Sequence, residues 1–322
     1  MNLRLYRELP FSAVLAFSSV LIGEPPPFAR KTHVYKTVGD CAIRADVYSP
    51  QQSGSRPVIL WIHGGALIMG SREGIRHAQL SRYLEAGFVV VSIDYRLAPE
   101  TKLPQILEDV EDAHRWVCSQ GPSLFEGDPG RIAVIGHSAG GYLTLTSGYR
   151  FKPRPKALIA FYGYGDIVGD WYSKPDPFYL REPAVSRDEA LASVGKQPIS
   201  ETPKAAMRRP FYLHCRQQGL WPTEVVGIDP VQGRAKFDPF CPVLNVTRDY
   251  PPTLLLHGDK DTDVPFQQSV DMARALKQAG VEHQLIPIAE GGHGFDGKTD
   301  APETVKAFEQ VMAFLNKHVA KQ

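Results

Sequence analysis

Apolar residues along the chain form short continuous runs that alternate with stretches of helical spacing. The runs cover residues 58–62, 88–93, 131–135, 156–161, 253–256 and 284–288. Runs of this length are typical of strands buried on both faces of a parallel sheet. Apolar residues recur every three to four positions in the stretches between them, which predicts helices over 72–86, 103–117, 140–148, 264–279 and 301–319. This alternation predicts an α/β fold, with a mostly parallel central sheet and helices on both of its faces.

Two segments depart from this alternation. Residues 32–48 alternate in part and turn at Gly39-Asp40, which predicts an antiparallel hairpin and brings the sheet to about eight strands. Residues 164–250 show no strong strand pattern but hold many prolines and aromatic residues. A long segment without sheet signals is usually functional or disordered, and its aromatic content argues against disorder. We therefore predict a helical cap insertion over one end of the sheet, whose aromatic residues also serve as extra core.

The first 30 residues are predicted to form an N-terminal extension of the domain at 31–322. Basic residues precede an apolar stretch at 11–22, which resembles a signal peptide in outline. However, Glu8 lies in the basic region, no clean cleavage site follows, and the stretch is shorter than the roughly 20 residues that span a membrane. The alternatives are a helix packed over the active site and an extension from an upstream start codon. We expect a cytoplasmic location, or secretion if residues 1–23 act as a signal peptide.

Composition narrows the classes of partner and cofactor. Of the 322 residues, 43% are hydrophobic and 22% are charged, which is enough for a sizeable core and excludes wholesale disorder. The net charge is +1 and no basic stripe stands out, so nucleic acid is not expected as a partner. The four cysteines lie far apart without a C-x-x-C pair, which argues against a zinc site and a disulfide framework. We expect no metal and no cofactor.

The strongest local signal is Gly136-His137-Ser138-Ala139-Gly140, a G-x-S-x-G pattern. It follows an apolar strand and opens a helix, which is the arrangement that a nucleophile elbow requires. The serine of such an elbow has a strained backbone, and side chains at the two glycine positions would collide in the tight turn. The helix N-terminus also favours negative charge near the serine. An ordinary glycine-rich turn is the alternative, but the flanking elements favour Ser138 as a nucleophile.

A second glycine-rich loop, His63-Gly64-Gly65-Ala66, directly follows the first buried strand. In α/β-hydrolases this position contributes to the oxyanion hole, and glycines let the backbone approach a substrate oxygen closely. The predicted donors are the N–H groups of Gly64, Gly65 and Ala139. The alternative is a tight turn without a ligand. We interpret His63 as a brace that hydrogen-bonds this loop rather than as a catalytic base.

The loop at 257–265 offers three carboxylates beside the end of a strand. An orienting acid must lie on such a loop and face an imidazole, and spacing alone leaves Asp259 and Asp261 open for this role. Asp263 is interpreted as the N-cap of the following helix, because Pro265 lies close to its start.

His293 lies in a glycine-rich loop, residues 290–295, after the last predicted strand. A catalytic histidine must reach the serine from a loop at the same edge of the sheet. Of the ten histidines, His293 combines a late position with flanking glycines after a strand. It is therefore the predicted general base.

The order of oxyanion loop, serine, acid and histidine matches the α/β-hydrolase order. At this point the chain resembles the hormone-sensitive-lipase-like branch of the α/β-hydrolases and the related acetyl and feruloyl esterases. The matching segments are HGGA at 63–66, IDYRLAPE at 93–100, GHSAGG at 136–141, and the loops of Asp261 and His293.

This resemblance runs from about residue 58 to the C-terminus, apart from the insertion. In these relatives the acid is usually the Asp of an H-G-x-x-D-x-x-V-P pattern, which falls on Asp261 here. Two departures stand out. The relatives usually have a third glycine at the position of Ala66, and their helical cap is commonly N-terminal, whereas the larger insertion here lies between the sixth and seventh core strands.

The sequence therefore predicts an α/β-hydrolase that cleaves carboxylic esters with short to medium acyl chains. Ser138, His293 and Asp261 are the expected triad, and Gly64, Gly65 and Ala139 the expected oxyanion hole. A small-molecule ester is the expected partner, and we expect no stable insertion into a membrane. The sequence leaves open whether the protein forms a homodimer. Two rivals are a prolyl-oligopeptidase-like serine peptidase and a non-catalytic small-molecule binder on the same fold. We expect the first less, because 322 residues leave no room for an N-terminal propeller.

Overall fold

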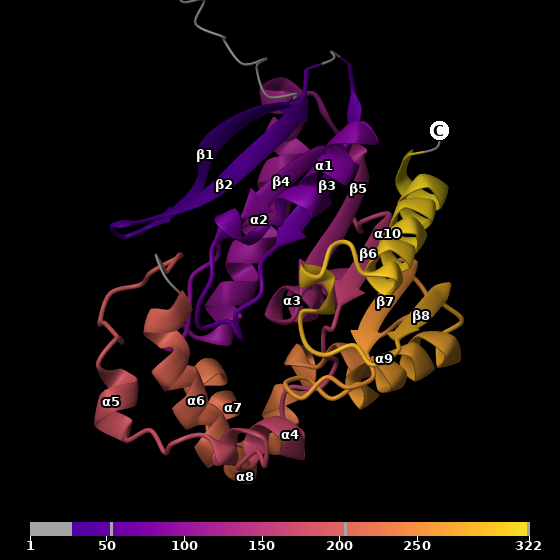
Figure 1. Ribbon diagram of the computed structural model, residues 1–322. Coiled ribbons are helices and arrows are strands. Elements are labelled where there is room, and N and C mark those ends of the chain that lie inside the picture. Colours follow the sequence, from indigo (N-terminus) through magenta and orange to yellow (C-terminus); the bar gives the residue numbers. More distant parts are fainter. Residues whose placement is uncertain (1–27, 52–53, 203–204, 321–322) are drawn as a thin grey trace, which may run out of the picture.

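The chain folds around an eight-stranded sheet (Figure 1). The structure is a computed structural model, and it describes residues 28–51, 54–202 and 205–320. Its strand order is β1-β2-β4-β3-β5-β6-β7-β8. The pairs β1–β2 and β2–β4 are antiparallel, and all later pairs are parallel. The predicted mostly parallel sheet of about eight strands is confirmed. The strands are β1 Phe28–Val38, β2 Cys41–Pro50, β3 Arg56–Ile62, β4 Val89–Ile93, β5 Gly127–His137, β6 Ala157–Phe161, β7 Thr253–Gly258 and β8 His283–Ile288.

The antiparallel hairpin forms as predicted and turns through Gly39, whose φ of 56° lies in the left-handed region that glycine tolerates. Its first strand begins at Phe28, within the range 1–30 that was assigned to the N-terminal extension. The apolar stretch at 11–22 lies outside the described residues.

Alternate residues of each buried strand face opposite sides of the sheet. In β3, Val58 and Leu60 belong to one apolar cluster, while Ile59 and Trp61 belong to the other. The first cluster includes α2 Leu103–Phe125, α3 Ala139–Arg150 and α9 Gln267–Gln278, and the second includes α1 His77–Glu85 and α10 Pro302–Leu315. Helices thus cover both faces of the sheet. Because β3 is buried on both sides, all of its positions favour apolar residues, which explains its continuous apolar run.

Two helices differ most from their predicted lengths, and tertiary contacts explain both. The α2 helix runs to Phe125, past the predicted end at residue 117, and buries Phe125 in the first apolar cluster. The predicted helix at 72–86 is split, and α1 begins only at His77. Its first turn is a separate 3₁₀ turn, because Asp94 accepts hydrogen bonds from both the backbone N–H and the guanidinium of Arg72.

The insertion between β6 and β7 is built from short helices rather than strands. It lies beyond the carboxyl ends of the parallel strands, at the bottom of Figure 1. Trp221 is fully buried, stacks on Tyr172 and donates its indole N–H to the carbonyl oxygen of Ala66. The aromatic residues of the insertion therefore form a core of their own and fasten it to the loop after β3. Its α-helices are α4 Asp170–Ser173, α5 Arg187–Leu191, α6 Arg209–Gln218, α7 Trp221–Val226 and α8 Pro230–Gly233.

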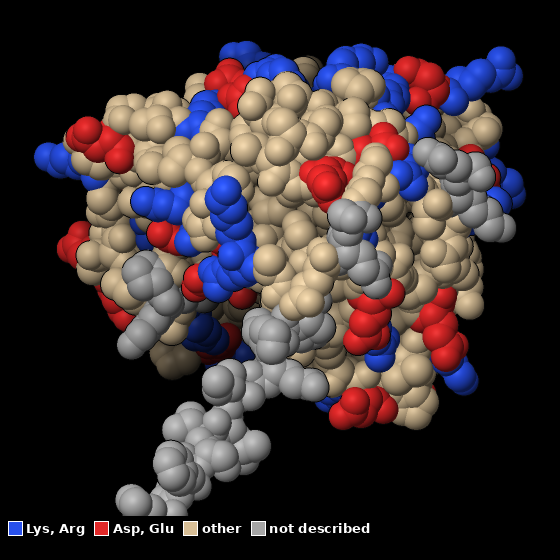
Figure 2. All heavy atoms as spheres, turned by 90° about the horizontal axis from the view of Figure 1, so that it is seen from above, with Lys and Arg blue, Asp and Glu red and all other residues tan. Residues whose placement is uncertain are grey.

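Charged side chains of both signs are interspersed over the face seen in Figure 2, without a large area of one sign. Within residues 28–51, 54–202 and 205–320, no helix combines the length and the apolar character needed to cross a membrane.

The packing of α2 gives a matched test of the core. Leu107 is 2% exposed and Leu124 is 41% exposed on the same helix. We expect Leu107→Ala to lower the free energy of unfolding by about 2–5 kcal/mol, because it removes apolar contacts and leaves a cavity. Leu124→Ala should change it by less than about 0.5 kcal/mol. Urea unfolding of both variants checks this, and equal effects would contradict the assigned faces of α2.

Candidate active site

Ser138 occupies a strained turn between β5 and α3. Its φ of 55° and ψ of −118° are rarely adopted by a residue with a side chain. A Cβ atom at Gly136 would overlap the carbonyl oxygen of Gly140, and one at Gly140 would overlap the carbonyl oxygen of Ile62. Both positions of the motif therefore require glycine, because the neighbouring backbone comes too close to leave room for a side chain.

The structure brings Ser138, His293 and Asp261 together from three different loops. The distance from Ser138 Oγ to His293 Nε2 is 3.1 Å, and His293 Nδ1 lies 2.8 Å from Asp261 Oδ2. A carboxylate can only accept, so this contact places the imidazole proton on Nδ1 and leaves Nε2 free to accept the Ser138 hydroxyl proton. Ser138, His293 and Asp261 thus form a continuous hydrogen-bonded chain, the arrangement of a serine, an imidazole and an orienting acid in a catalytic triad.

Tertiary contacts separate the two carboxylates that the sequence left open. The carboxylate of Asp261 is fully buried, while Asp259 is exposed. Asp261 Oδ1 accepts hydrogen bonds from the backbone N–H groups of Asp263 and Val264, which hold its second oxygen toward His293. Burial raises the pKa of Asp261, but hydrogen bonds to His257 and His293 outweigh it and hold that pKa below its ordinary value. Asp261 is therefore a fixed, ionised partner of the imidazole.

Asp263 does not cap the helix that follows, and that interpretation was wrong. The α9 helix begins at Gln267 and its N-cap residue is Phe266, which makes no side-chain capping bond. Asp263 is instead turned toward the insertion, where Oδ1 accepts hydrogen bonds from Tyr179 and Arg216. Its second oxygen, Oδ2, lies 3.4 Å from His293 Nε2.

The loop after β3 lies directly against the elbow. A Cβ atom at Gly64 would come within 2.7 Å of the His137 carbonyl oxygen, and Gly65 has a φ of 110° that favours glycine. Within the described part of the chain, the N–H groups of Gly64, Gly65 and Ala139 have no hydrogen-bond acceptor. These backbone donors beside Ser138 are available to a ligand oxygen.

His63 and Ala66 hold the shape of this loop. The His63 ring stacks on Tyr95 with a centroid distance of 4.2 Å, and its Nδ1 lies 2.7 Å from the carbonyl oxygen of Gly64. Burial lowers the pKa of His63 to about 4, so the ring is neutral near pH 7. Ala66 has a φ of 55°, which explains why a third glycine suits this position in the relatives.

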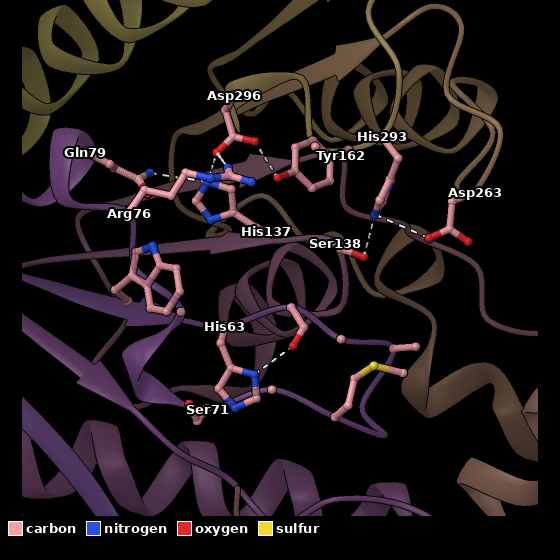
Figure 3. A pocket seen from close by; sticks show the side chains of 18 of the residues that line it. His63, Ser71, Arg76, Gln79, His137, Ser138, Tyr162, Asp263, His293 and Asp296 are labelled. Atoms are coloured by element: carbon pink, nitrogen blue, oxygen red, sulfur yellow. Dashed lines mark hydrogen bonds and ion pairs between the residues drawn. The ribbon is translucent and has the colours of Figure 1, made fainter. Parts of the chain in front are cut away.

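A cavity of about 400 Å³ opens onto Ser138 and His293. Figure 3 shows Asp263 on one side of His293 and a cluster of polar side chains around Asp296 on the other. Gly64, Gly65 and Met69 line it from the loop after β3, and Tyr212 lines it from the insertion. The cavity therefore combines the hydroxyl of Ser138, backbone donors and polar walls. In the described ranges, no group of three His, Cys, Asp or Glu side chains is arranged to hold a metal ion.

Comparison with known proteins places this geometry in a family. Residues 45–276 match the sequence profile of the BD-FAE family. The chain belongs to the BD-FAE family. An α/β-hydrolase superfamily protein from Enterococcus faecalis has the same fold, with a TM-score of 0.71, 22% identity, and coverage of 90% of this chain and 99% of that one. These matches confirm the predicted relationship to the α/β-hydrolase superfamily.

Two fungal proteins extend the comparison. Carboxyl esterase 2 from the mycorrhizal fungus Tuber melanosporum has a TM-score of 0.66 and 22% identity over 92% of this chain and 89% of its own. The non-reducing polyketide synthase ascC of Acremonium egyptiacum is 31% identical over 84% of this chain, which spans only 14% of the length of that synthase.

In this BD-FAE protein, the cavity wall beside α1 contains polar residues that no sequence motif indicated. Asp296 is 1% exposed and accepts a hydrogen bond from Tyr162 at 2.6 Å, while Arg76 lies 2.5 Å from its other oxygen. His137 Nε2 lies 3.3 Å from the same oxygen (Figure 3). Tyr162 directly follows β6 and Asp296 follows His293 by three residues, so their positions at the carboxyl edge of a parallel sheet were the available signal.

The carboxylates around His293 lead to a prediction that can be measured without any substrate. Burial lowers the pKa of His293, but the hydrogen bond to Asp261 and the negative charges of Asp263 and Asp296 outweigh it, so the pKa lies above 6.5. We expect the His293 imidazole to titrate above this value in an NMR pH titration, with His293→Gln used to assign its signal. A pKa at or below 6.5 would contradict the arrangement of carboxylates around the ring.

Proposed function

We propose that this chain is a serine hydrolase that cleaves carboxylic esters through an acyl-enzyme. The observation that carries the proposal is the hydrogen-bonded chain from Ser138 through His293 to Asp261, located at a strained elbow beside unoccupied backbone donors. Membership of the BD-FAE family and the esterase named among the solved neighbours support ester cleavage in general.

The proposed reaction has two halves. His293 Nε2 takes the proton of Ser138 as Oγ attacks the ester carbonyl carbon, and the N–H groups of Gly64, Gly65 and Ala139 bind the resulting oxyanion. His293 then gives the proton to the leaving alcohol oxygen, and the acyl group remains on Oγ. A water molecule attacks this ester in turn, with its proton passing to His293 and then to Ser138, and the carboxylic acid is released.

Strain at Ser138 has a specific role in this scheme. The elbow holds Oγ at the helix N-terminus in one position, so the serine does not lose conformational freedom when the substrate binds. Asp261 keeps the Nδ1 proton in place and stabilises the imidazolium that forms when Ser138 attacks. Because His293 must be neutral to accept a proton, activity should rise with pH through its raised pKa.

The size of the cavity favours small esters. Its volume of about 400 Å³ lies toward the lower end of the range of about 300–1,000 Å³ found for small-molecule sites. We therefore propose short- to medium-chain acyl esters as substrates. Peptides, as in a prolyl-oligopeptidase-like enzyme, and binding without turnover are the alternatives.

The curated relatives do not extend the proposal to polyketide synthesis. The chain spans 14% of the length of the first synthases that it matches, so the activity of those whole proteins involves much that lies outside this match. What is proposed here is the chemistry of the matched region alone.

We also propose a cytoplasmic location, with secretion as the alternative if residues 1–23 act as a signal peptide. The four free cysteines support the first of these, because paired cysteines are typical of oxidising compartments.

Removal of the nucleophile tests the proposal most directly. We expect the wild type to hydrolyse p-nitrophenyl acetate and butyrate faster than the octanoate, and Ser138→Ala to lower kcat by about 10⁶-fold because no other group can form the acyl-enzyme. Circular dichroism shows whether the variant is folded. Lack of turnover by folded wild type would overturn the esterase proposal and direct the search to peptide substrates and then to ligand binding.

The identity of the acid is tested by a matched pair of carboxylates on one loop. Asp261→Asn should lower kcat by about 10⁴-fold, because an amide at that position favours the wrong tautomer of His293. Asp259→Asn changes an exposed carboxylate and should leave kcat within about twofold of wild type. Steady-state kinetics with p-nitrophenyl butyrate distinguishes the two, and a larger loss in Asp259→Asn would reverse the assignment.

A further inference from the structure

Asp263 is held beside the reacting atoms by the insertion. Its Oδ1 accepts hydrogen bonds from the hydroxyl groups of Tyr179 and Tyr212 and from Arg216 Nη1 at 2.6 Å. Arg216 also donates to the backbone carbonyl oxygen of Asp263 at 3.1 Å. Three side chains from a segment remote in sequence therefore determine the direction of one carboxylate.

Arg216 is an unusually well-held anchor for this carboxylate. It is 1% exposed, and its guanidinium lies within 6 Å of the ring centroids of four aromatic residues. Its second charged partner is Asp176, which is not among the residues that line the cavity. Two carboxylates share this one arginine, so the group as a whole keeps a negative charge. The four aromatic residues are Trp171, Tyr172, Tyr179 and Tyr212.

The other oxygen of Asp263 faces the reaction. Oδ2 lies 3.4 Å from His293 Nε2, the nitrogen whose other contact is Ser138 Oγ at 3.1 Å (Figure 3). The carboxylate lines the cavity and its side chain is 18% exposed. In the proposed reaction Nε2 gives its proton to the leaving alcohol oxygen, so Oδ2 lies next to the path of that alcohol.

A carboxylate in this position distinguishes alcohols by the group they carry near the ester oxygen. A hydroxyl or ammonium group one or two carbons away can donate a hydrogen bond to Oδ2, and bonds to charged acceptors are stronger than neutral ones. A carboxylate on the alcohol would instead meet like charge. Positive charge on the cavity wall comes from Arg76, on the far side of His293, where it is already paired with Asp296.

We propose that Asp263 is a specificity-determining residue, which selects esters whose alcohol portion carries a hydroxyl or ammonium donor beside the scissile bond and disfavours esters that carry a carboxylate there. The inference rests on the proposed ester hydrolysis and adds the substrate class. It also gives the insertion a function, because Arg216 and the two tyrosines set the direction of Asp263.

Three butyrate esters with different alcohol portions provide the test: 2-hydroxyethyl butyrate, propyl butyrate and carboxymethyl butyrate. For the wild type, kcat/KM should decrease in that order. Asp263→Ala should reduce the hydroxyethyl-to-propyl ratio about tenfold, as expected for loss of one hydrogen bond to a charged acceptor. In Asp263→Asn the amide oxygen stays with Arg216 and the two tyrosines, so the NH₂ group takes the place of Oδ2 and the negative charge is lost. This variant should therefore reduce the propyl-to-carboxymethyl ratio about tenfold.

Asp176→Asn is the matched control. It removes the other charged partner of Arg216 and leaves the carboxylate beside His293 in place. Both ratios should then stay within about twofold of wild type, because discrimination depends on Asp263 itself rather than on the stability of the insertion. Ratios of kcat/KM within one preparation do not depend on the fraction of folded enzyme, and comparison of variants cancels the intrinsic reactivity of each ester.

The outcomes separate this inference from the proposed function. Hydrolysis of propyl butyrate with ratios unchanged in both Asp263 variants would overturn the role of Asp263 and leave the esterase intact. Equal changes in Asp176→Asn would also overturn it, because they would trace selectivity to the packing around Arg216. Absence of turnover of all three esters and of p-nitrophenyl butyrate by folded wild type would reject the proposed function, and this inference with it.

Discussion

The backbone of Ser138 is the constraint on which the rest of the site depends. A residue with a side chain adopts its φ of 55° and ψ of −118° only when its surroundings hold it there. The close approach of Gly140 to β3 and of Gly136 to the first turn of α3 makes that possible, and both contacts exclude a Cβ atom. The same contact between α3 and β3 brings the loop of Gly64 and Gly65 against the elbow. One steric requirement therefore determines the position of the serine and of its neighbouring backbone donors.

The insertion adds a second, electrostatic layer to this arrangement. Arg216 is buried among aromatic rings, where its charge requires partners because an unpaired buried charge is very costly. Asp176 and Asp263 supply them, and the bond to Asp263 turns that carboxylate toward His293. Packing within the insertion thus holds a negatively charged carboxylate beside Nε2 of His293. The raised pKa of His293 reflects this, since Asp263 is one of the groups that raise it.

Most strand positions were predicted more closely than the end of α2 and the start of α1. The apolar runs placed β3, β4, β6 and β8 to within two residues, because burial on both faces leaves little choice of residue type. Helix ends depend on contacts from elsewhere in the chain. The α2 helix continues as far as Phe125, whose ring packs in the core. The α1 helix begins later than predicted because Asp94 binds Arg72, which lies at the start of the predicted helix.

The sequence by itself determined the alternation of elements, the elbow and the order of the residues that the structure brings together, because each depends on local sterics or on the end of a strand. Spacing alone left Asp259 and Asp261 open, although the resemblance to known esterases favoured Asp261, and Asp263 was assigned to a helix cap. Only the tertiary structure decided these, because the direction of each carboxylate is set by partners far away in the chain. His293 lies 32 positions from Asp261, and Arg216 lies 47 positions from Asp263. The spacing of residues along the chain does not carry that information.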